Sequence, residues 1–302
     1  MQHTLWTEKY RSQTLDQYIG NTELKTTIQS WIQKNDIPHL LLYGKAGTGK
    51  TTLAKLITSN IDCDMMYINA SDENGIDTIR DKVKSFASSS SFRPLKVVIL
   101  DESDYLTINA QASLRNVIET FSAKTRFILT CNYPNKVIPP LHSRCQGFHI
   151  TKNDHTEFTA RAATVLVTEG VEFDLDVLDT YVKATYPDLR KCLNLLQPNS
   201  QTGRLSAPSS ADKSARDWRL DCVDLFKHGR IREARTLLCQ SASPEESEEI
   251  FRWMYDNLDL WGRTPEQQDQ AIVIIRDGIA KIPLVADQEI NLSATLIELS
   301  QL

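Results

Sequence analysis

The residues whose types and spacing best suit chemistry form one loop that fits the pattern G-x-x-x-x-G-K-[ST]. Its members are Gly44, Lys45, Ala46, Gly47, Thr48, Gly49, Lys50 and Thr51, followed by Thr52. Glycines let several backbone N–H groups converge on one phosphate, and the N-terminus of a following helix adds positive potential. Lys50 is expected to reach the β- and γ-phosphates, and the Thr51 hydroxyl to bind Mg²⁺. The loop therefore predicts a nucleotide-binding site.

The segments on either side of this loop match the order of strand, loop and helix that the motif requires. The apolar run 39–43 leads into the loop, and residues 52–57 leave it with helical spacing. A glycine loop that fits the motif by chance is the alternative, and the flanking pattern disfavours it.

Two adjacent acids, Asp101 and Glu102, follow the apolar run 96–100. A fully apolar strand is typical of a buried parallel sheet, whose carboxyl edge collects such side chains. A triphosphate with Mg²⁺ requires one acid near the metal and another that acts on the attacking water. We predict that Asp101 holds Mg²⁺ through water and that Glu102 polarises the attacking water. Two acids that cap the next helix are the alternative.

Asn132 ends a further apolar run, 126–131. We expect its side chain at the same sheet edge as Asp101, where the amide can hydrogen-bond the γ-phosphate or the water. A lone Asn after a strand is more often a turn residue, so this prediction depends on the other site residues.

The order of the elements predicts an α/β fold with a five-stranded parallel sheet. Strands are expected at 39–43, 65–69, 96–102, 126–132 and 146–150, and helices at 22–34, 52–57, 76–86 and 109–121. Short strands that alternate with helices form a parallel sheet covered on both faces, which is an αβα sandwich.

In the remainder of the chain the sequence pattern predicts helices. They are expected at 154–168, 175–184, 188–196, 217–227, 231–240, 244–258, 265–281 and 287–299. Residues 197–212 are rich in Pro, Ser, Asn and Gly, which is typical of a linker. We therefore predict three domains, 1–150, 151–200 and 213–302, the last with a packing or oligomerisation role.

Arg190 stands in the first turn of its expected helix, after Pro187 and the capping Asp188. A guanidinium at that position opposes the helix dipole and requires an anionic partner, for which a phosphate is suitable. A solvated surface arginine is the alternative.

Two other segments carry side chains for binding, each with a plain structural alternative. The helix expected at 76–86 leaves Arg80, Lys82 and Lys84 off its apolar face, where they suit either a phosphate backbone or a solvated surface. The lead-in Trp6–Arg11 suits either an extended aromatic and cationic segment around a nucleotide base or a tail packed on the core.

Composition limits the classes of protein that fit. The chain has 302 residues and a formal net charge of −5, which excludes a surface that is basic throughout but permits a local basic patch. Its six cysteines contain no C-x-x-C pair, and no apolar run approaches ~20 residues. We expect a soluble, intracellular protein with reduced thiols, no membrane association and a cytoplasmic location.

Seven segments together resemble the ATPase subunits of DNA sliding-clamp loaders, within the AAA+ class, over essentially the whole chain. They are Trp6–Arg11, Gly44–Thr51, Asn69–Asp72, Asp101–Glu102, Thr130–Asn132, Ser143–Cys145 and Pro187–Lys191. The Ser143-Arg144-Cys145 triplet distinguishes clamp loaders from most other AAA+ proteins. The chain is similar to replication factor C small subunits and to the large subunit of the T-even-type phage loader, and Met65-Met66 and Tyr186-Pro187-Asp188 favour the phage version.

The resemblance implies a role for each matching residue. Arg144 resembles the arginine finger that reaches the ATP of the neighbouring subunit in trans, Asn132 the first sensor and Arg190 the second. The remaining matches are Tyr10, Arg11 and Ile19 with Gly20 for the adenine pocket, and Arg80, Lys84 and Asn109 for the DNA template strand.

The resemblance also implies cofactors, partners and a location. These are ATP and Mg²⁺, a sliding clamp, primer–template DNA, and a heteropentamer with several copies of this chain and a smaller subunit. The location implied is the cytoplasm, that of the host if a phage encodes the chain, in association with the nucleoid. The third domain resembles the collar that holds such subunits together.

Two positions depart from the family pattern. Ser12 stands where proline usually follows the lead-in motif. Glu73, Asn74 and Gly75 stand where a basic residue often restrains the catalytic glutamate. The alternatives are another AAA+ DNA machine, such as a branch-migration helicase or initiator, a non-hydrolysing scaffold, and a P-loop kinase. The Ser143-Arg144-Cys145 triplet argues against the first, the intact acids against the second, and the long helical region against the third.

Overall fold

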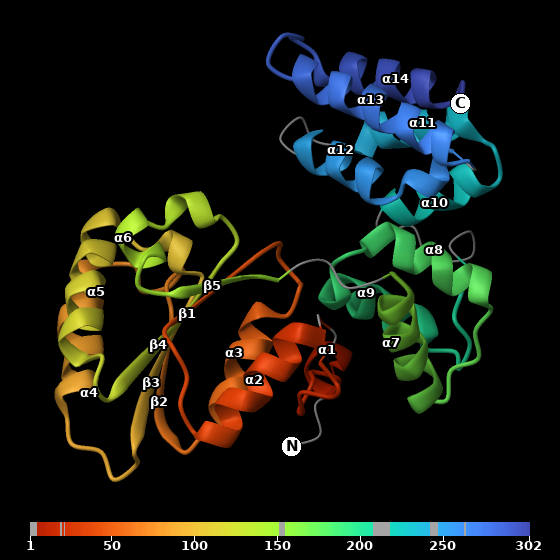
Figure 1. Ribbon diagram of the computed structural model, residues 1–302. Helices are drawn as coiled ribbons and strands as arrows, with labels where there is room; N and C mark the ends of the chain where they lie inside the picture. Colours follow the sequence, from red (N-terminus) through yellow and green to blue (C-terminus); the bar gives the residue numbers. More distant parts are fainter. Residues whose placement is uncertain are drawn as a thin grey trace. The chain divides into compact units, whose positions relative to one another are not determined.

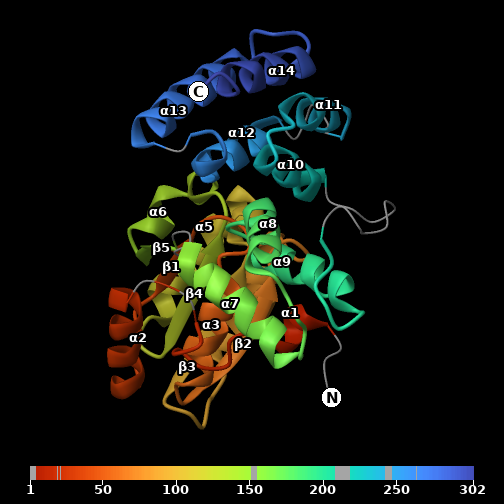
Figure 2. The same ribbon diagram turned by 90° about the vertical axis from the view of Figure 1, so that its right-hand side faces the viewer.

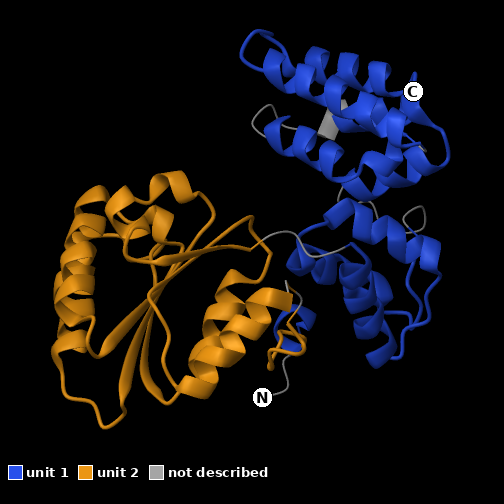
Figure 3. Cartoon of the chain, in the orientation of Figure 1, with its two compact units in different colours: residues 1–9, 155–302 blue, residues 10–154 orange. Residues whose placement is uncertain are grey.

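The computed structural model describes residues 5–18, 20, 22–150, 155–207, 218–241, 247–262 and 264–302. The chain divides into two compact units, one of residues 10–154 and one of residues 1–9 with 155–302 (Figure 3). The first unit is therefore inserted into the second along the sequence.

The first unit contains the predicted parallel sheet of five strands, in the order β2-β3-β4-β1-β5. Its strands are β1 Leu40–Tyr43, β2 Cys63–Asn69, β3 Leu95–Asp101, β4 Thr125–Cys131 and β5 Gln146–His149. Every pairing is parallel. The carboxyl ends of β1, β3 and β4 therefore meet at one edge, where Tyr43 pairs with Cys131 and the chain leaves toward Gly44, Glu102 and Asn132.

Helices cover both faces of this sheet, as predicted (Figure 1). They are α2 Thr22–Lys34, α3 Lys50–Ser59, η1 Thr78–Val83, α4 Lys84–Ser88, η2 Ser103–Tyr105, α5 Ile108–Phe121, η3 Pro134–Lys136 and α6 Pro139–His142. One apolar core joins the sheet to α2 and α3 through Ile28, Leu53 and Ile57. The other joins the opposite face to η1 and α5 through Ile79 and Leu114. The sheet edge that carries the candidate site is thus fixed from both sides.

The segment expected as one regular helix at 76–86 is instead a π-helix, η1, followed by α4. Ile79 and Val83 are both fully buried, as expected, while Arg80 and Lys84 are exposed. Side chains spaced by four residues share a face in a regular α-helix as well, so the apolar pattern does not distinguish the two kinds of helix.

The second unit is helical. It contains α1 Trp6–Lys9, α7 His155–Thr168, α8 Leu175–Thr185, α9 Leu189–Leu196, η4 Pro198–Ser200, α10 Trp218–Lys227, α11 Ile231–Ser241, α12 Ser247–Asp256, η8 Leu258–Leu260, α13 Pro265–Lys281 and α14 Gln288–Leu299. Figures 1 and 2 show α13 and α14 side by side. The expected helix starts at Asp154 and at Pro244 lie outside the described residues. None of the described helices combines the length and apolar content of a membrane span.

One of the two expectations for the lead-in motif Trp6–Arg11 was an extended segment, and the structure does not show one at residues 6–9. Trp6–Lys9 forms the short helix α1, whose Trp6 is buried. The Trp6 backbone N–H donates to Gln197 Oε1 at 3.0 Å, and Lys9 pairs with Glu169 on the segment after α7 at 2.7 Å. Burial of the indole and these long-range contacts outweigh the extended conformation, so the packed alternative is correct for residues 6–9.

The first part of the expected linker 197–212 is folded. Leu205 is buried, its N–H donates to Glu172 O at 2.8 Å, and the Glu172 N–H donates to Gly203 O at 2.9 Å. Polar composition misled the prediction here because backbone groups of the segment pair with the turn before α8. Farther along, Lys227 of α10 pairs with Asp179 of α8 at 2.6 Å, so the helices on either side of residues 208–217 contact each other. The three predicted domain boundaries stay a prediction.

Candidate nucleotide site

The phosphate loop connects β1 to α3, and at two of its positions, Gly44 and Gly49, only glycine fits. Gly49 precedes α3 with φ of 88°, in the left-handed region. At Gly44 a side chain would place its Cβ 2.3 Å from the Ile150 carbonyl oxygen. The loop therefore closes tightly against the end of β5, which directs its backbone toward the carboxyl edge of the sheet.

The ammonium of Lys50 lies at the centre of the loop. It donates to Gly44 O at 2.8 Å, to Lys45 O at 2.6 Å and to Asn132 Oδ1 at 2.8 Å. Burial lowers the pKa of Lys50, and Cys131 and the acids at the edge oppose that change. A largely desolvated cation whose partners are mostly neutral oxygens gains strongly from a phosphate.

Asp101 gathers three hydroxyl groups. Thr51 Oγ1 donates to its Oδ1 at 2.8 Å, Tyr67 OH to its Oδ2 at 2.8 Å, and Thr130 Oγ1 to its Oδ1. The two predicted Mg²⁺ ligands, Thr51 and Asp101, are therefore in direct contact. A hydroxyl and a carboxylate suit Mg²⁺, which takes few protein ligands and completes its shell with phosphate oxygens and water.

Glu102 follows Asp101 in a left-handed conformation, with φ of 55° and ψ of 43°. Its N–H donates to Thr130 Oγ1 at 3.0 Å, so the same threonine holds both acids. A non-glycine residue in this region is uncommon and is enriched where structure over-determines the backbone, as at active sites. The conformation distinguishes Glu102 from an ordinary residue before a helix.

Asn132 follows β4 at the same sheet edge as Asp101, as predicted, and it also accepts a hydrogen bond from Lys50, which was not predicted. A third acid fixes the turn that carries Asn132. The N–H groups of Asn132 and Tyr133 donate to Asp104 Oδ2 at 3.3 and 3.2 Å. Asp104 is buried, which makes this contact a firm support. The Lys50–Asn132 and Thr51–Asp101 hydrogen bonds thus form one network that is joined through the backbone, because Lys50 and Thr51 are consecutive, and Glu102 lies beside it.

Besides Asp104, three further supporting residues of this site were missed by sequence reasoning. Tyr67 and Thr130 bind Asp101 from neighbouring strands, and Tyr18 lies beneath the phosphate loop. A Cβ on Gly49 would lie 2.9 Å from the Tyr18 ring, and burial raises the pKa of Tyr18 far above its usual value. Thr130 belongs to the segment Thr130–Asn132, which contributes to the family resemblance. Nothing in the sequence near Tyr18 or Tyr67 indicates which residues they contact.

The structure describes some of the residues that the sequence predicts for an adenine pocket. Burial and the hydrogen bond to Asp101 raise the pKa of Tyr67, and the charge of Arg11 opposes that rise, so Arg11 lies near this edge. Gly20 follows the buried Tyr18, and its Cβ position meets the Tyr18 ring. Ile19 lies outside the described residues, and the role of Tyr10 stays a prediction.

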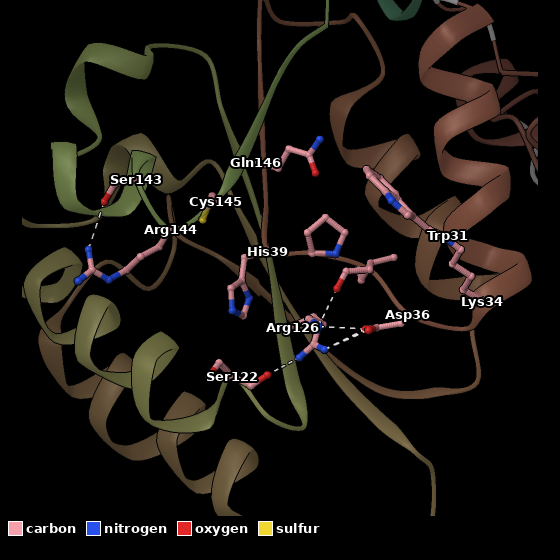
Figure 4. A pocket seen from close by; sticks show the side chains of 12 residues that line it. Trp31, Lys34, Asp36, His39, Ser122, Arg126, Ser143, Arg144, Cys145 and Gln146 are labelled. Carbon is pink, nitrogen blue, oxygen red and sulfur yellow. Dashed lines mark hydrogen bonds and ion pairs between the residues drawn. The ribbon is translucent and has the colours of Figure 1, made fainter.

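Arg144 does not join this network. It lies in the turn between α6 and β5, hence at the amino edge of the sheet, whereas Lys50 follows the carboxyl end of β1. Its Nε donates to Glu119 Oε1 at 2.8 Å. Residues 143–146 border an open hollow of about 650 Å³ that Trp31, His39 and Arg126 also line, and the Arg144 side chain turns toward Ser143 (Figure 4). Arg144 therefore faces away from the nucleotide site of its own chain.

The other predicted residues lie outside the network as well. Arg190 is exposed in the first turn of α9, in the helical unit, where Asp188 caps the helix by accepting from the Lys191 N–H at 3.0 Å. Arg80, Lys84 and Asn109 are exposed. Their segments are neighbours, because η1 packs on α5 and the Thr107 N–H donates to Asn74 O at 3.2 Å.

Residues 40–152 match the model of the ATPase family associated with various cellular activities (AAA). The chain is 39% identical over 316 residues to the replication factor C small subunit of Sulfurisphaera tokodaii, covering 98% of this chain and 95% of that protein. The same protein of Saccharolobus solfataricus is 32% identical over 99% of this chain and 95% of its own length. The chain belongs to the replication factor C small subunit family.

Membership makes the chain an AAA ATPase of the clamp-loader class, and it confirms the resemblance found from the sequence motifs. The match to the Halobacterium salinarum small subunit, 41% identical over 205 residues, spans 64% of that relative's length. None of the three relatives named is a phage protein, so the phage version stays a prediction.

Solved structures support the fold. The RuvB Holliday junction branch migration motor of Thermotoga maritima superposes with a TM-score of 0.56 at 17% identity, over 76% of this chain and 85% of that chain. A variant of the same protein gives 0.60 at 16% identity. At this identity the likeness concerns the fold alone, and the predicted αβα sandwich is confirmed.

Proposed function

We propose that this chain binds ATP with Mg²⁺ and hydrolyses it, within a ring of subunits, to open a sliding clamp and place it on primer–template DNA. The observation that carries the proposal is the separation of two parts. A connected phosphate and metal site lies at the carboxyl edge of the sheet, and the arginine suited to complete it lies at the amino edge. One chain alone does not bring Arg144 to Lys50, which supports the proposal that a neighbouring copy supplies the arginine.

Each residue of the site has a physical task in this proposal. Lys50 and the loop N–H groups hold the β- and γ-phosphates, and Thr51 and Asp101 hold Mg²⁺, which neutralises charge on the phosphates when bound. Glu102 accepts a hydrogen bond from the attacking water, and Asn132 orients that water or the γ-phosphate. Arg144 of a neighbouring copy stabilises negative charge in the transition state.

The remaining predicted residues serve assembly and recognition in the proposal. Tyr10, Arg11 and Ile19 bound the adenine, and Arg190 acts on the nucleotide from the helical region 151–200. Residues 213–302 form the collar of a heteropentamer that includes a smaller subunit. Arg80, Lys84 and Asn109 contact the template strand, and a few cations from each of several copies make a salt-dependent phosphate track despite the net charge of −5. The proposed location is the cytoplasm, at the nucleoid.

The test is steady-state ATP hydrolysis by the chain, alone and with its partner subunits, with and without clamp and primed DNA. We expect low turnover for the isolated chain and strong joint stimulation of the assembly by clamp and primed DNA. Repetition at several salt concentrations measures the phosphate contacts, because binding that releases counterions weakens steeply with salt.

Branch migration is the rival function, since RuvB shares the fold. It predicts stimulation by branched DNA with no response to any clamp. That outcome, or equal turnover by the isolated chain and the assembly, contradicts the proposal.

A further inference from the structure

The guanidinium of Arg144 is bound almost entirely by groups of its own subunit. Its Nε and Nη2 atoms donate to one carboxylate oxygen of Glu119, near the end of α5. Its Nη1 atom donates to Pro140 O at 2.8 Å and to Ser143 Oγ at 3.3 Å. Arginine has five N–H donors, and these contacts engage four of them. Binding to a phosphate therefore requires Arg144 to give up contacts that it already makes.

The contact with Glu119 is charged but partly open to solvent. The hydrogen bond from Arg144 lowers the pKa of the Glu119 carboxyl, so that group is ionised at neutral pH. The Arg144 side chain is 30% exposed and that of Glu119 is 51% exposed. An ion pair in this environment changes an equilibrium constant by about fivefold at most. A triphosphate carries more charge than one carboxylate and can accept paired hydrogen bonds from a guanidinium, so it competes with Glu119 for Arg144.

Arg144 also has room to move. Ser143, Cys145 and Gln146 border the open hollow of about 650 Å³, so the turn that carries Arg144 is not enclosed by core side chains on that side (Figure 4). Because the Arg144 side chain is itself 30% exposed, core packing does not fix it in its present position.

We propose that Glu119 is a positioning residue that keeps Arg144 on its own subunit until the triphosphate of a neighbour takes the guanidinium, an inference that rests on the proposed function. Competition between the Glu119 carboxylate and the phosphate restrains hydrolysis in an assembly that lacks DNA. Once DNA aligns the subunits, the phosphate contact dominates and the restraint no longer matters.

The decisive variant is Glu119→Gln, which removes the charge and retains an acceptor oxygen. We expect the turnover of the assembly without DNA to rise about threefold, in keeping with a partly exposed ion pair. Turnover with saturating clamp and DNA stays unchanged. A residue with a merely structural role would instead lower both rates when substituted. The rise must also vanish in an Arg144→Ala background, because Glu119 acts only through that side chain.

A matched control exists in the helical unit. Glu233 lies on α11 and forms a partly exposed ion pair with Arg230, which directly precedes that helix. The hydrogen bond from Arg230 likewise lowers the pKa of the Glu233 carboxyl. Glu233→Gln removes the same charge and the same kind of pair, and should leave the DNA-free rate unchanged. An equal rise in this variant, or no rise in Glu119→Gln, overturns the proposal.

A second measurement uses the isolated chain and needs neither clamp nor DNA. The Nε–H signal of Arg144 in a nitrogen-15 NMR spectrum is assigned by its loss in Arg144→Ala. It should shift in Glu119→Gln and not in Glu233→Gln. An unshifted signal overturns the Glu119 contact, whereas a wild-type assembly without DNA stimulation contradicts the proposed function instead.

Discussion

The two parts of the hydrolysis site are built in different ways. At the carboxyl edge, Lys50 contacts three acceptors and Asp101 accepts from three hydroxyls, and both residues are buried. At the amino edge, Arg144 is held by a turn of its own chain and by the half-exposed Glu119. The difference indicates that the part acting on the chain's own nucleotide is preorganised, while the part acting on a neighbour's nucleotide is free to change partners.

The sharpest way to separate the two parts is Arg144→Ala. We expect turnover of the assembly to fall about 10³-fold or more, because a finger supplied in trans contributes that much to rate. Affinity of the isolated chain for ATP, measured by equilibrium binding, should remain unchanged. Arg276→Ala, which removes an exposed arginine of α13, is the control. A loss of nucleotide affinity in Arg144→Ala would place the side chain in its own site.

The rigidity of the carboxyl edge is tested by Tyr18. Tyr18→Ala removes a ring that is 4% exposed and supports Gly49, and we expect a loss of about 3–5 kcal/mol in the free energy of unfolding. Tyr18→Phe keeps the ring and loses only a long contact of 3.5 Å from the hydroxyl to Thr48 O, so its cost should be below about 1 kcal/mol. Urea unfolding distinguishes the two. Equal costs would mean that the hydroxyl, not the ring, supports the loop.

Thr130 offers a finer test of the same edge. Thr130→Val removes the hydroxyl that donates to Asp101 and accepts from the Glu102 N–H, and it should cost about 1–3 kcal/mol in unfolding free energy and lower the DNA-stimulated rate. Thr125 lies on the same strand, is equally buried and has a hydroxyl without a hydrogen-bond partner. Thr125→Val should be neutral or stabilising. A greater loss in Thr125→Val would contradict the assignment of the network.

The smallest expected effect lies at the amino edge, where His39 lines the hollow beside Arg144. Burial, then the charge of Arg126, lowers the pKa of folded His39 to about 4, against the opposing effect of Asp36. The unfolded chain therefore binds a proton that the folded chain does not between about pH 6.5 and 4. Stability is complete above pH 6.5 and declines as pH falls through this window. His39→Gln should flatten that decline in urea midpoints, and an unchanged slope would assign it to other groups.

The sequence indicates the elements that neighbouring residues encode, but it does not indicate the contacts between residues that lie far apart in the chain. Apolar strands, the phosphate loop, the acids after β3 and the helix α2 are each encoded in neighbouring residues, and all were predicted. The contacts of Tyr18 with Thr48, of Thr130 with Asp101 and of Arg144 with Glu119 span 30, 29 and 25 residues. They depend on strand order and register, which a single sequence does not specify.

Two local predictions were also incomplete, for physical reasons. The π-helix η1 was not predicted, because Ile79 and Val83, spaced by four residues, share a face in a regular α-helix as well, so the sequence pattern does not distinguish the two. The lead-in motif is helical at residues 6–9 because Trp6 finds a buried place beside α9, which comes much later in the chain.

The packing of Trp6 against the helical unit affects the order in which parts of the protein fold during synthesis. The Trp6 N–H binds Gln197, a residue 191 positions later, so the helical unit cannot be completed until residues 10–154 and the segment up to Gln197 have been synthesised. Residues 10–154 are continuous in the sequence and depend on no later segment in this way. They can therefore fold during synthesis, since domains generally fold as units as they emerge. The nucleotide-binding unit is thus expected to fold on the nascent chain before α1 can pack against the helical unit to which it belongs.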